Sequence, residues 1–453
     1  MRETHGSEAK GESEVAAPAV SAGTKQGADS HDPSRWGWVE SGVWTERMLA
    51  ALDNGVKGGK WFSLMDKVYA PRTLELAWGR VESKRGAGGV DGQSIERFAA
   101  QARRYLGELH ETLKGDGYQP QPVRRVEIAK AGGGQRPLGI PTVKDRVVQG
   151  ALKLVLEPIF EREFADTSYG FRPGRSCKDA LRRVRGLLDA GHVWVVDADI
   201  QGYFDNIPHA KLLERVKERV SDGRVLRLVE KYLKQDIVSE LAQWTPTGGV
   251  PQGAVLSPLL ANVYLHPLDV ELNAAGYRSV RYADDLVIAC RSREEAESAL
   301  AQMRRWCELH GLTLHPGKTQ VGDCRVAGQG FDFLGYRFEA GRRWVRKKSL
   351  KAFKARVKAK TRRTRGDSLR VVIADLNRTL QGWFAYFKHA HRATVRPLDG
   401  FIRRRLRALL RKHQHRPGMG RCAADHHRWP NVFFAQHGLF TLETAHAMAS
   451  RSR

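Results

Sequence analysis

Two pairs of aspartates stand at the ends of apolar, strand-like runs. "HVWVVDADI" carries Asp197 and Asp199, and "SVRYADDLVIAC" carries Asp284 and Asp285. Aspartate is unfavourable in strands, and carboxylates beside an apolar sheet repel one another and lose hydration. A divalent cation between them offsets the repulsion, and hard oxygen ligands without nearby His or Cys suit Mg²⁺ or Mn²⁺. Two such ions can activate a 3′-hydroxyl and stabilise a leaving pyrophosphate. By themselves, the same aspartates would also suit a turn in which they cap backbone groups.

The chemistry requires elements that bring these carboxylates together. We expect a buried strand over 192–200, with Asp197 and Asp199 on one face, and a strand–turn–strand over 279–290 with both acids at its tip. If these elements are sheet neighbours, Asp199 and Asp284 can meet. Amphipathic helices are predicted from Cys177 and from Arg293, the latter closed by Gly311, and residues 331–347 alternate like a hairpin. Ser257 and Pro258 suit an N-cap followed by proline at the first helical position.

The positive charge is concentrated near the C-terminus. The chain of 453 residues has a formal charge of +26, and residues 341–420 hold 25 Lys/Arg against 3 Asp/Glu, a net of +22. A solvated helix face is the simplest explanation of a charged run, but a block that carries nearly the whole excess favours a nucleic-acid partner. At this length we expect two or three domains.

Other classes of protein are disfavoured. No apolar run reaches the roughly 18–20 residues of a membrane helix, and nothing resembles a signal peptide. The five cysteines are scattered without CxxC pairs, which argues against a disulfide framework and suits the cytoplasm. Residues 1–35 lack periodicity and are rich in Gly, Ser, Ala and Glu, so we expect a disordered tail.

Taken together, the motifs resemble one family. "DIQGYFDNI" (199–207), "PQGAVLSPLLANVYL" (251–265) and "YADD" (282–285) resemble the palm motifs of reverse transcriptases, specifically the group II intron-encoded kind. "GQRPLGIPTVKDRVVQGAL" and "SYGFRPGRSCKDAL" resemble its finger motifs, and "GLTLHPGKT" and "FDFLGYRF" its later palm motifs. "GAGGVDG" resembles its N-terminal block, and residues 376–417 resemble its thumb and maturase region. The ending resembles members without an endonuclease domain.

The resemblance implies an α+β, right-hand polymerase fold with fingers, a palm built on an antiparallel sheet, and a helical thumb/maturase domain. The implied divisions are a tail (1–35), an N-terminal extension and start of the fingers (36–120), fingers and palm (121–340), the basic thumb/maturase domain (341–420) and a C-terminal tail (421–453). The implied activity is RNA-directed DNA synthesis and assistance of intron splicing. Without an endonuclease domain, such a protein would need another source of primer for mobility.

The resemblance also assigns roles to residues. Asp199, Asp284 and Asp285 match the aspartates that bind two Mg²⁺ ions, with Asp285 secondary and Asp197 a bystander. Lys318 matches a lysine proposed to protonate pyrophosphate, and Phe204 matches the steric gate that excludes a 2′-hydroxyl; its neighbour Tyr203 is more readily a core residue. Lys130 and Arg136 match residues that grip the triphosphate, and Gln252 and Gly253 match the loop that contacts nucleotide and template.

Intron RNA is the partner expected for the basic block, together with an RNA template, a DNA primer, dNTPs and a DNA target site. The candidate RNA contacts are Arg403, Arg404, Arg405, Arg407, Arg411 and Lys412. The oligomeric state stays open, a dimer included. Two further hypotheses remain: a splicing factor whose polymerase site is unused, and a related reverse transcriptase with a host role, against which the basic block argues. A viral RNA-dependent RNA polymerase is more remote because its motif would begin with glycine.

Overall fold

The computed structural model describes residues 36–129 and 134–451. The tail expected to be disordered (1–35) and the candidate triphosphate ligand Lys130 therefore lie outside the described residues. The chain forms two compact units that do not follow its linear order. One takes its residues from the chain up to Pro122, Pro141–Glu163 and Ala210–Gln235; the other takes Val123–Ile140, Phe164–His209 and everything after Gln235.

The first unit is helical. Its longest helix, α6, is buried along most of its length and packs against α3, where Gly150 lets the backbone approach Ala77. Its helices are α1 (Glu46–Asn54), the 3₁₀ turn η1 (Lys57–Gly59), α2 (Met65–Tyr69), α3 (Pro71–Ser83), α4 (Ile95–Ala99), α5 (Ala102–Lys114), α6 (Val143–Glu161), nearly all of α9 (His209–Lys217) and α10 (Gly223–Leu233).

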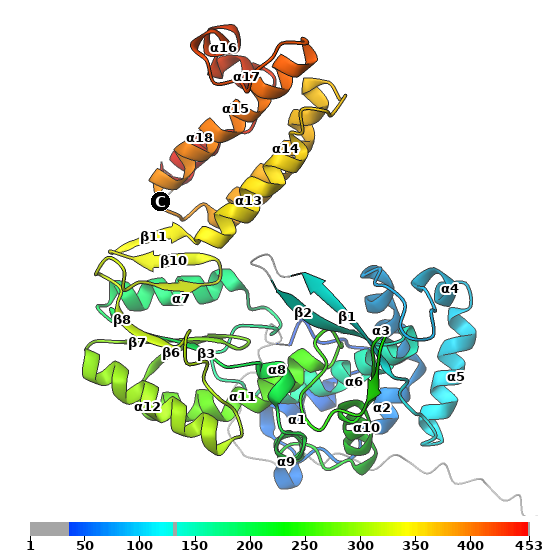
Figure 1. The fold of residues 1–453 in the computed structure, drawn as a ribbon. Coiled ribbons are helices and arrows are strands. Elements are labelled where there is room, and N and C mark those ends of the chain that lie inside the picture. Colours follow the sequence, from blue (N-terminus) through cyan, green and yellow to red (C-terminus); the bar gives the residue numbers. More distant parts are fainter. Residues whose placement is uncertain (1–35, 130–133, 452–453) are drawn as a thin grey trace, which may run out of the picture. The chain divides into compact units, whose positions relative to one another are not determined.

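A four-stranded antiparallel sheet with the order β6-β7-β3-β8 lies in the second unit. Its strands are β3 (Trp194–Asp199), β6 (Arg278–Tyr282), β7 (Asp285–Cys290) and β8 (Gln320–Asp323). Helix α7 (Cys177–Asp189) packs on one face and α12 (Arg293–Leu309) on the other, as Figure 1 shows. The predicted strands 192–200 and 279–290, the helices from Cys177 and Arg293, and the terminating Gly311 (φ 72°) are thereby confirmed.

The long helix α11 (Ser257–Ala274) begins differently from the prediction. Its N-cap position is Leu256, with no side-chain cap, and Ser257 is the first helical residue. The Ser257 hydroxyl donates to the carbonyl of Pro251 at 2.8 Å. The side chain therefore fastens the preceding loop instead of capping the helix, because the tight turn of residues 251–256 places that carbonyl within its reach. The short helix α8 (Tyr203–Asn206) follows β3.

Two smaller sheets complete the strands of this unit. One has the order β2-β1-β4-β5, from β1 (Val123–Ala129), β2 (Gln135–Ile140), β4 (Ile237–Val238) and β5 (Gln243–Trp244). The other is a meander of β9 (Phe331–Phe333), β10 (Tyr336–Glu339) and β11 (Arg342–Val345). The hairpin predicted over 331–347 is thus two consecutive hairpins. Left-handed residues at both turns, Leu334–Gly335 and Ala340–Gly341, make the reversals.

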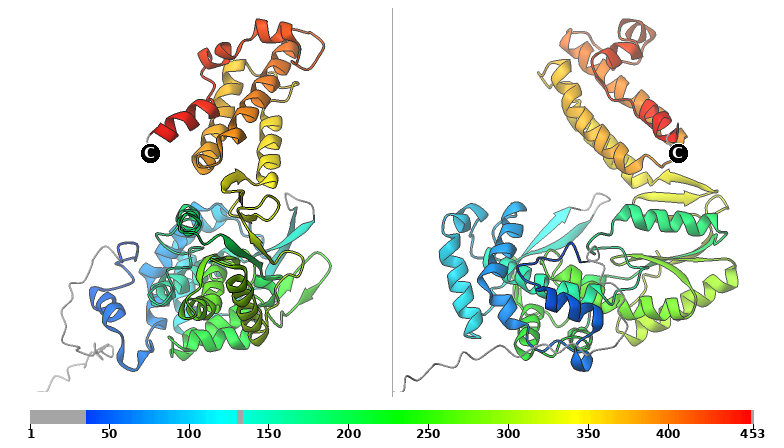
Figure 2. Two further views of the ribbon diagram at one scale, coloured as in Figure 1. Left: turned by 90° about the vertical axis from the view of Figure 1, so that its left-hand side faces the viewer. Right: turned by 180° about the vertical axis from the view of Figure 1, so that it is seen from behind.

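The C-terminal helices of the second unit pack around a core of their own. They are α13 (Lys347–Lys360), α14 (Leu369–Phe387), the 3₁₀ turn η2 (Arg392–Thr394), α15 (Val395–His413), α16 (Ala423–Arg428), α17 (Asn431–Gln436) and α18 (Leu442–Arg451). Helices α14 and α15 run alongside one another in both views of Figure 2. The Tyr336 hydroxyl donates to the Tyr386 carbonyl and the Tyr386 hydroxyl donates to the Leu334 carbonyl, both at 2.7 Å, which fastens α14 to the meander. No helix in the described residues is both long and apolar enough to span a membrane.

Candidate active site

The aspartates meet where β3 and β7 pair. The register places Asp199 opposite Asp285 and Asp197 opposite Val287. Because alternate residues of a strand share a face, Asp197, Asp199 and Asp285 all lie on the face that carries Val195, Val287 and helix α7. Asp284 lies in the turn between β6 and β7, directly after Ala283 in the left-handed region (φ 61°). The prediction that the two strands carrying the aspartates are neighbours in one sheet is confirmed.

Burial and mutual repulsion raise the pKa values of these carboxyls. Burial, followed by the charges of Asp197 and Asp284, raises the pKa of Asp285 to about 7. Burial also raises the pKa of Asp197 to about 6, with Asp332 and Asp199 adding to it. The pKa of Asp284 is raised by burial and then by Asp199. Each raised pKa means that the ionised carboxylate is disfavoured by too little neighbouring positive charge, as expected at a site that binds a cation.

The donor chemistry fits a hard divalent cation. The cluster offers carboxylate oxygens, which Mg²⁺ prefers. In the described part of the chain, however, no three Asp, Glu, His or Cys side chains converge into a ready-made cation cage. Asp199 is engaged by Lys318, whose Nζ lies 2.9 Å from its Oδ2. Cation binding would therefore require this ion pair to rearrange.

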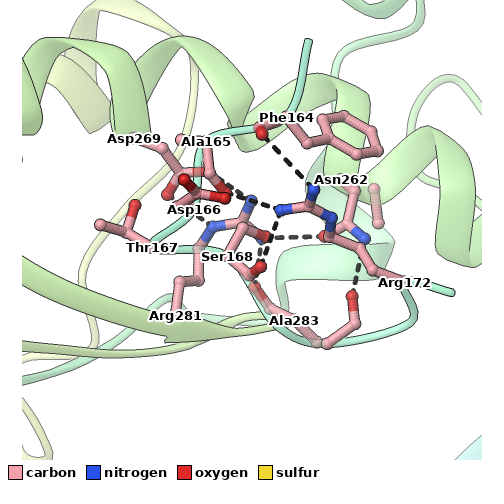
Figure 3. A network of polar contacts seen from close by, with 12 residues as sticks. Phe164, Ala165, Asp166, Thr167, Ser168, Arg172, Asn262, Asp269, Arg281 and Ala283 are labelled. Carbon is pink, nitrogen blue, oxygen red and sulfur yellow. Dashed lines mark hydrogen bonds and ion pairs between the residues drawn. The ribbon is translucent and has the colours of Figure 1, made fainter. Parts of the chain in front are cut away.

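A buried polar network supports the turn that carries Asp284 (Figure 3). Arg281 is fully buried and donates to both oxygens of Asp269, at 2.8 and 2.5 Å. Its Nη1 also donates to the Asn262 side chain and to the carbonyl of Ala283, both at 2.9 Å. Asp269 and Asn262 belong to α11, so this network fastens the turn to the helix that follows "PQG". The motif analysis missed Arg281, although an arginine inside an apolar strand was a visible signal.

The finger residue Arg136 and the loop residue Gln252 are in direct contact. Arg136 Nε donates to Gln252 Oε1 at 2.7 Å, and the positive charge of Arg136 lowers the pKa of Asp284 against the effect of burial. Gly253 has φ 109°, and an added Cβ would lie 2.6 Å from the Gly139 carbonyl oxygen. This glycine therefore permits the close approach of strand β2.

The two aromatic residues after Gly202 have different surroundings. Tyr203 is buried, and its hydroxyl donates to the carbonyl of Ala261 at 2.5 Å. It is a core residue, as the sequence favoured. Phe204, the candidate steric gate, is 9% exposed and touches Phe171 edge to face, with ring centroids 6.4 Å apart.

The six basic candidates on α15 separate into two groups. Arg407 is 2% exposed and donates to the Trp429 carbonyl and the Asn431 side chain. Arg405 donates to Thr361, and Arg411 pairs with Asp425 at 2.7 Å. Arg407 therefore lies in the helical core, whereas Arg405 and Arg411 are half-buried and hydrogen-bonded to neighbouring segments. Half-buried Arg403 and Arg404 and exposed Lys412 form the other group. Helix α13 adds exposed Lys347, Lys351, Lys354 and Lys358 at helical spacing on one side.

Comparisons with known proteins identify both parts of the chain. Residues 128–338 match the family "Reverse transcriptase (RNA-dependent DNA polymerase)", and residues 350–429 match "Group II intron, maturase-specific domain". Protein YkfC of Escherichia coli K12 is 34% identical over 318 residues, which cover 60% of this chain and 82% of YkfC.

Two further relatives share shorter stretches. The group II intron-encoded protein LtrA of Lactococcus lactis is 39% identical over 202 residues, covering 44% of this chain and 33% of LtrA. An uncharacterized 91 kDa protein in the cob intron of Schizosaccharomyces pombe is 31% identical over 293 residues, covering 51% of this chain and 35% of that protein. The matched part of this chain thus spans about a third of the length of each. The fold, the paired carboxylates and the two family matches together show that the chain belongs to the group II intron reverse transcriptase/maturase family.

Proposed function

We propose that this chain is an RNA-directed DNA polymerase that also acts as an intron maturase. It would bind its own group II intron RNA, assist splicing, and copy RNA into DNA from a DNA primer at a target site. The observation that carries the proposal is the pairing of Asp199 with Asp285 beside the Asp284 turn, within a reverse transcriptase domain that is followed by a maturase domain.

Asp199, Asp284 and Asp285 would hold two Mg²⁺ ions, with Mn²⁺ as an alternative, which would activate the primer 3′-hydroxyl and stabilise the departing pyrophosphate. Arg136 and Lys130 would bind the triphosphate, since ammonium and guanidinium groups suit phosphate oxygens. Lys318, already beside Asp199, would donate a proton to the leaving pyrophosphate. Gln252 and Gly253 would line the nucleotide and template site, and Phe204 would contact the sugar.

RNA binding would use the outward part of the basic block. Of the predicted set, Arg405, Arg407 and Arg411 are already bonded to neighbouring segments of the chain. We therefore assign the RNA contacts to Arg403, Arg404 and Lys412 on α15. Phosphate contacts made by such residues give an affinity that falls steeply with salt. In the proposed division of the chain, residues 36–120 form the N-terminal extension and start of the fingers, residues 121–340 the fingers and palm, and residues 341–420 the thumb/maturase domain.

Primer extension on an RNA template with dNTPs and Mg²⁺ tests the polymerase assignment. Asp284→Ala should lower extension by about a thousandfold or more because it removes a ligand of the reacting centre. Asp197→Asn is the matched control: it changes a carboxyl on the same sheet face that is proposed not to bind the ions, and extension should stay within about tenfold of wild type.

RNA binding by each variant separates the competing hypotheses. All three proteins should bind intron RNA equally. Wild-type protein that binds RNA tightly and promotes splicing, but does not extend a primer, would refute the polymerase assignment and leave a splicing factor. Equal loss of extension in Asp197→Asn and Asp284→Ala would place the reacting centre elsewhere on the sheet.

A further inference from the structure

Phe171 has an unusual conformation close to the carboxylates. Its φ is 61°, in the left-handed region that bulky residues avoid, and its side chain is 46% exposed. The left-handed backbone of this residue and the exposure of its apolar ring to water each cost free energy. Such strain persists only where the surrounding structure enforces it, and it is concentrated at functional sites.

The backbone on both sides of Phe171 is fastened to the Asp284 turn and its surroundings. Before it, Asn262 Nδ2 donates to the Gly170 carbonyl at 2.8 Å, and Tyr169 N donates to the Arg281 carbonyl at 2.8 Å. Gly170 itself packs so closely on Ala283 that no side chain would fit. After it, the Arg172 guanidinium donates to the carbonyls of Ala165 and Ser168, at 2.6 and 2.8 Å, as Figure 3 shows. These contacts leave the Phe171 backbone little freedom to relax.

The Phe171 ring is directed onto Phe204. The two rings meet edge to face, with an interplanar angle of 83°. Phe204 in turn contacts Tyr203, which is anchored through its hydroxyl to Ala261. Phe204 therefore contacts two rings, that of buried Tyr203 and that of exposed Phe171. A phenyl ring excludes a substituent sterically only if it is prevented from moving aside, and contact with the Phe171 ring supplies such a restraint.

We propose that Phe171 is a specificity-determining residue of the polymerase, which braces Phe204 and forms a second apolar wall beside C2′ of the incoming nucleotide's sugar. The proposal rests on the proposed function and deepens it, because it assigns sugar selectivity to two rings instead of one. Apolar surroundings alone reject an added hydroxyl only by about a hundredfold. A rigid pair of rings adds steric exclusion, since a 2′-hydroxyl would have to displace a ring that the fastened loop holds in place.

The test compares kcat/KM for a dNTP and the matching rNTP in primer extension. Phe171→Asn and Phe171→Gly remove the ring but tolerate the left-handed backbone, so the loop should keep its path. Both should lower the preference for dNTP by about tenfold or more, chiefly through better use of rNTP. Phe171→Tyr keeps the ring and should retain the preference. In a Phe204→Ala background, Phe171→Asn should lower the preference by a smaller factor than in the wild type, because there is no Phe204 ring left to brace and only the wall formed by Phe171 itself is lost.

Ala340→Gly provides a control for backbone strain alone. Ala340 is also a left-handed non-glycine residue (φ 51°), but it lies in the β10–β11 turn, and its substitution should leave the preference unchanged. If Phe171→Asn lowers the use of dNTP and rNTP equally, or leaves their ratio unchanged, Phe171 only supports the fold and the inference is overturned. If wild-type protein makes no DNA at all, the proposed function fails first and this inference fails with it.

Discussion

The pKa values of the carboxyls on the sheet face and of Asp375 among the C-terminal helices are shifted in opposite directions. On the sheet face, burial and neighbouring acids raise the pKa of Asp197 to about 6 and that of Asp285 to about 7. Among the helices, hydrogen bonds from Lys360 and Arg365 lower the pKa of Asp375 to about 2. Asp375 therefore stabilises its domain as an ion, whereas the sheet carboxyls destabilise theirs. The contrast teaches that Asp375 serves the fold, whereas the sheet carboxyls weaken it, as expected for residues that the proposed function assigns to a bound cation.

Buried arginines show that burial alone does not explain this contrast. Arg281 under the sheet turn and Arg407 in α15 are both almost fully buried and hydrogen-bonded. Arg281 is neutralised by a carboxylate, Asp269, whereas Arg407 donates mainly to neutral oxygens of Trp429 and Asn431. Burial, followed by the positive charge of Arg403, lowers the pKa of Arg407. Each region thus uses a buried cation to fasten chain segments that are distant in sequence.

The largest effect should come from breaking the buried pair below the turn. Arg281→Met leaves the Asp269 carboxylate buried without its partner, and should lower the free energy of unfolding by about 3–5 kcal/mol. The double variant Arg281→Met/Asp269→Leu removes both charges and should recover a large part of that loss. Urea denaturation of the three proteins measures this. Equal destabilisation of the single and double variants would show that the loss comes from the missing hydrogen bonds of the pair and not from an uncompensated buried charge.

A substitution on the sheet face should instead stabilise the metal-free protein. The raised pKa means that the folded protein holds a proton on Asp285 between about pH 4 and 7 that the unfolded chain has lost, so the cost of ionising it develops as pH rises through this range. In chelator, Asp285→Asn should raise the free energy of unfolding by about 1–3 kcal/mol at pH 8. At pH 4 the gain should vanish. A gain that is the same at both pH values would mean that repulsion is not its cause.

Charge reversal on the helices should change RNA binding without changing stability. Arg404→Glu/Lys412→Glu alters two outward residues and should weaken binding of intron RNA by about tenfold or more, with a shallower dependence on salt. Arg407→Met is the control, since it removes a cation of the same helix that is engaged in the core. It should lower the free energy of unfolding, but RNA binding by the folded protein should keep nearly the same dependence on salt. The opposite pattern would place the RNA on another face.

The smallest effect should come from the acid among the helices. The lowered pKa of Asp375 means that its contribution to stability is present above about pH 4 and is lost as pH falls towards 2. Because Asp375 is 20% exposed, solvent screens part of this energy, and Asp375→Asn should cost about 1 kcal/mol at pH 7. Near pH 2 the two proteins should unfold alike. If Asp375→Asn is still less stable than the wild type at pH 2, the destabilisation comes from altered packing or hydrogen bonds and not from the lost negative charge.

The amino-acid sequence by itself determined the local elements and the chemistry they carry. The strands that end at Asp199 and begin at Asp285, the tight turn between β6 and β7, and the helices α7 and α12 follow from patterns within about twenty residues, which is the range over which periodicity and turn chemistry act. The segregation of positive charge and the family motifs are also properties of the chain alone.

Tertiary structure decided which residues work together. Asp199 and Lys318 are 119 positions apart, and Arg136 and Gln252 are 116 apart, so no local pattern could join them. Packing also decided that Arg407 points into the core, because the periodicity of a helix rich in arginine does not say which cations face solvent. The left-handed Phe171 is the clearest case: nothing in its own side chain favours that conformation. It is enforced by the contacts of Gly170 with the distant Asn262 and Ala283, and by those of Arg172 with Ala165 and Ser168.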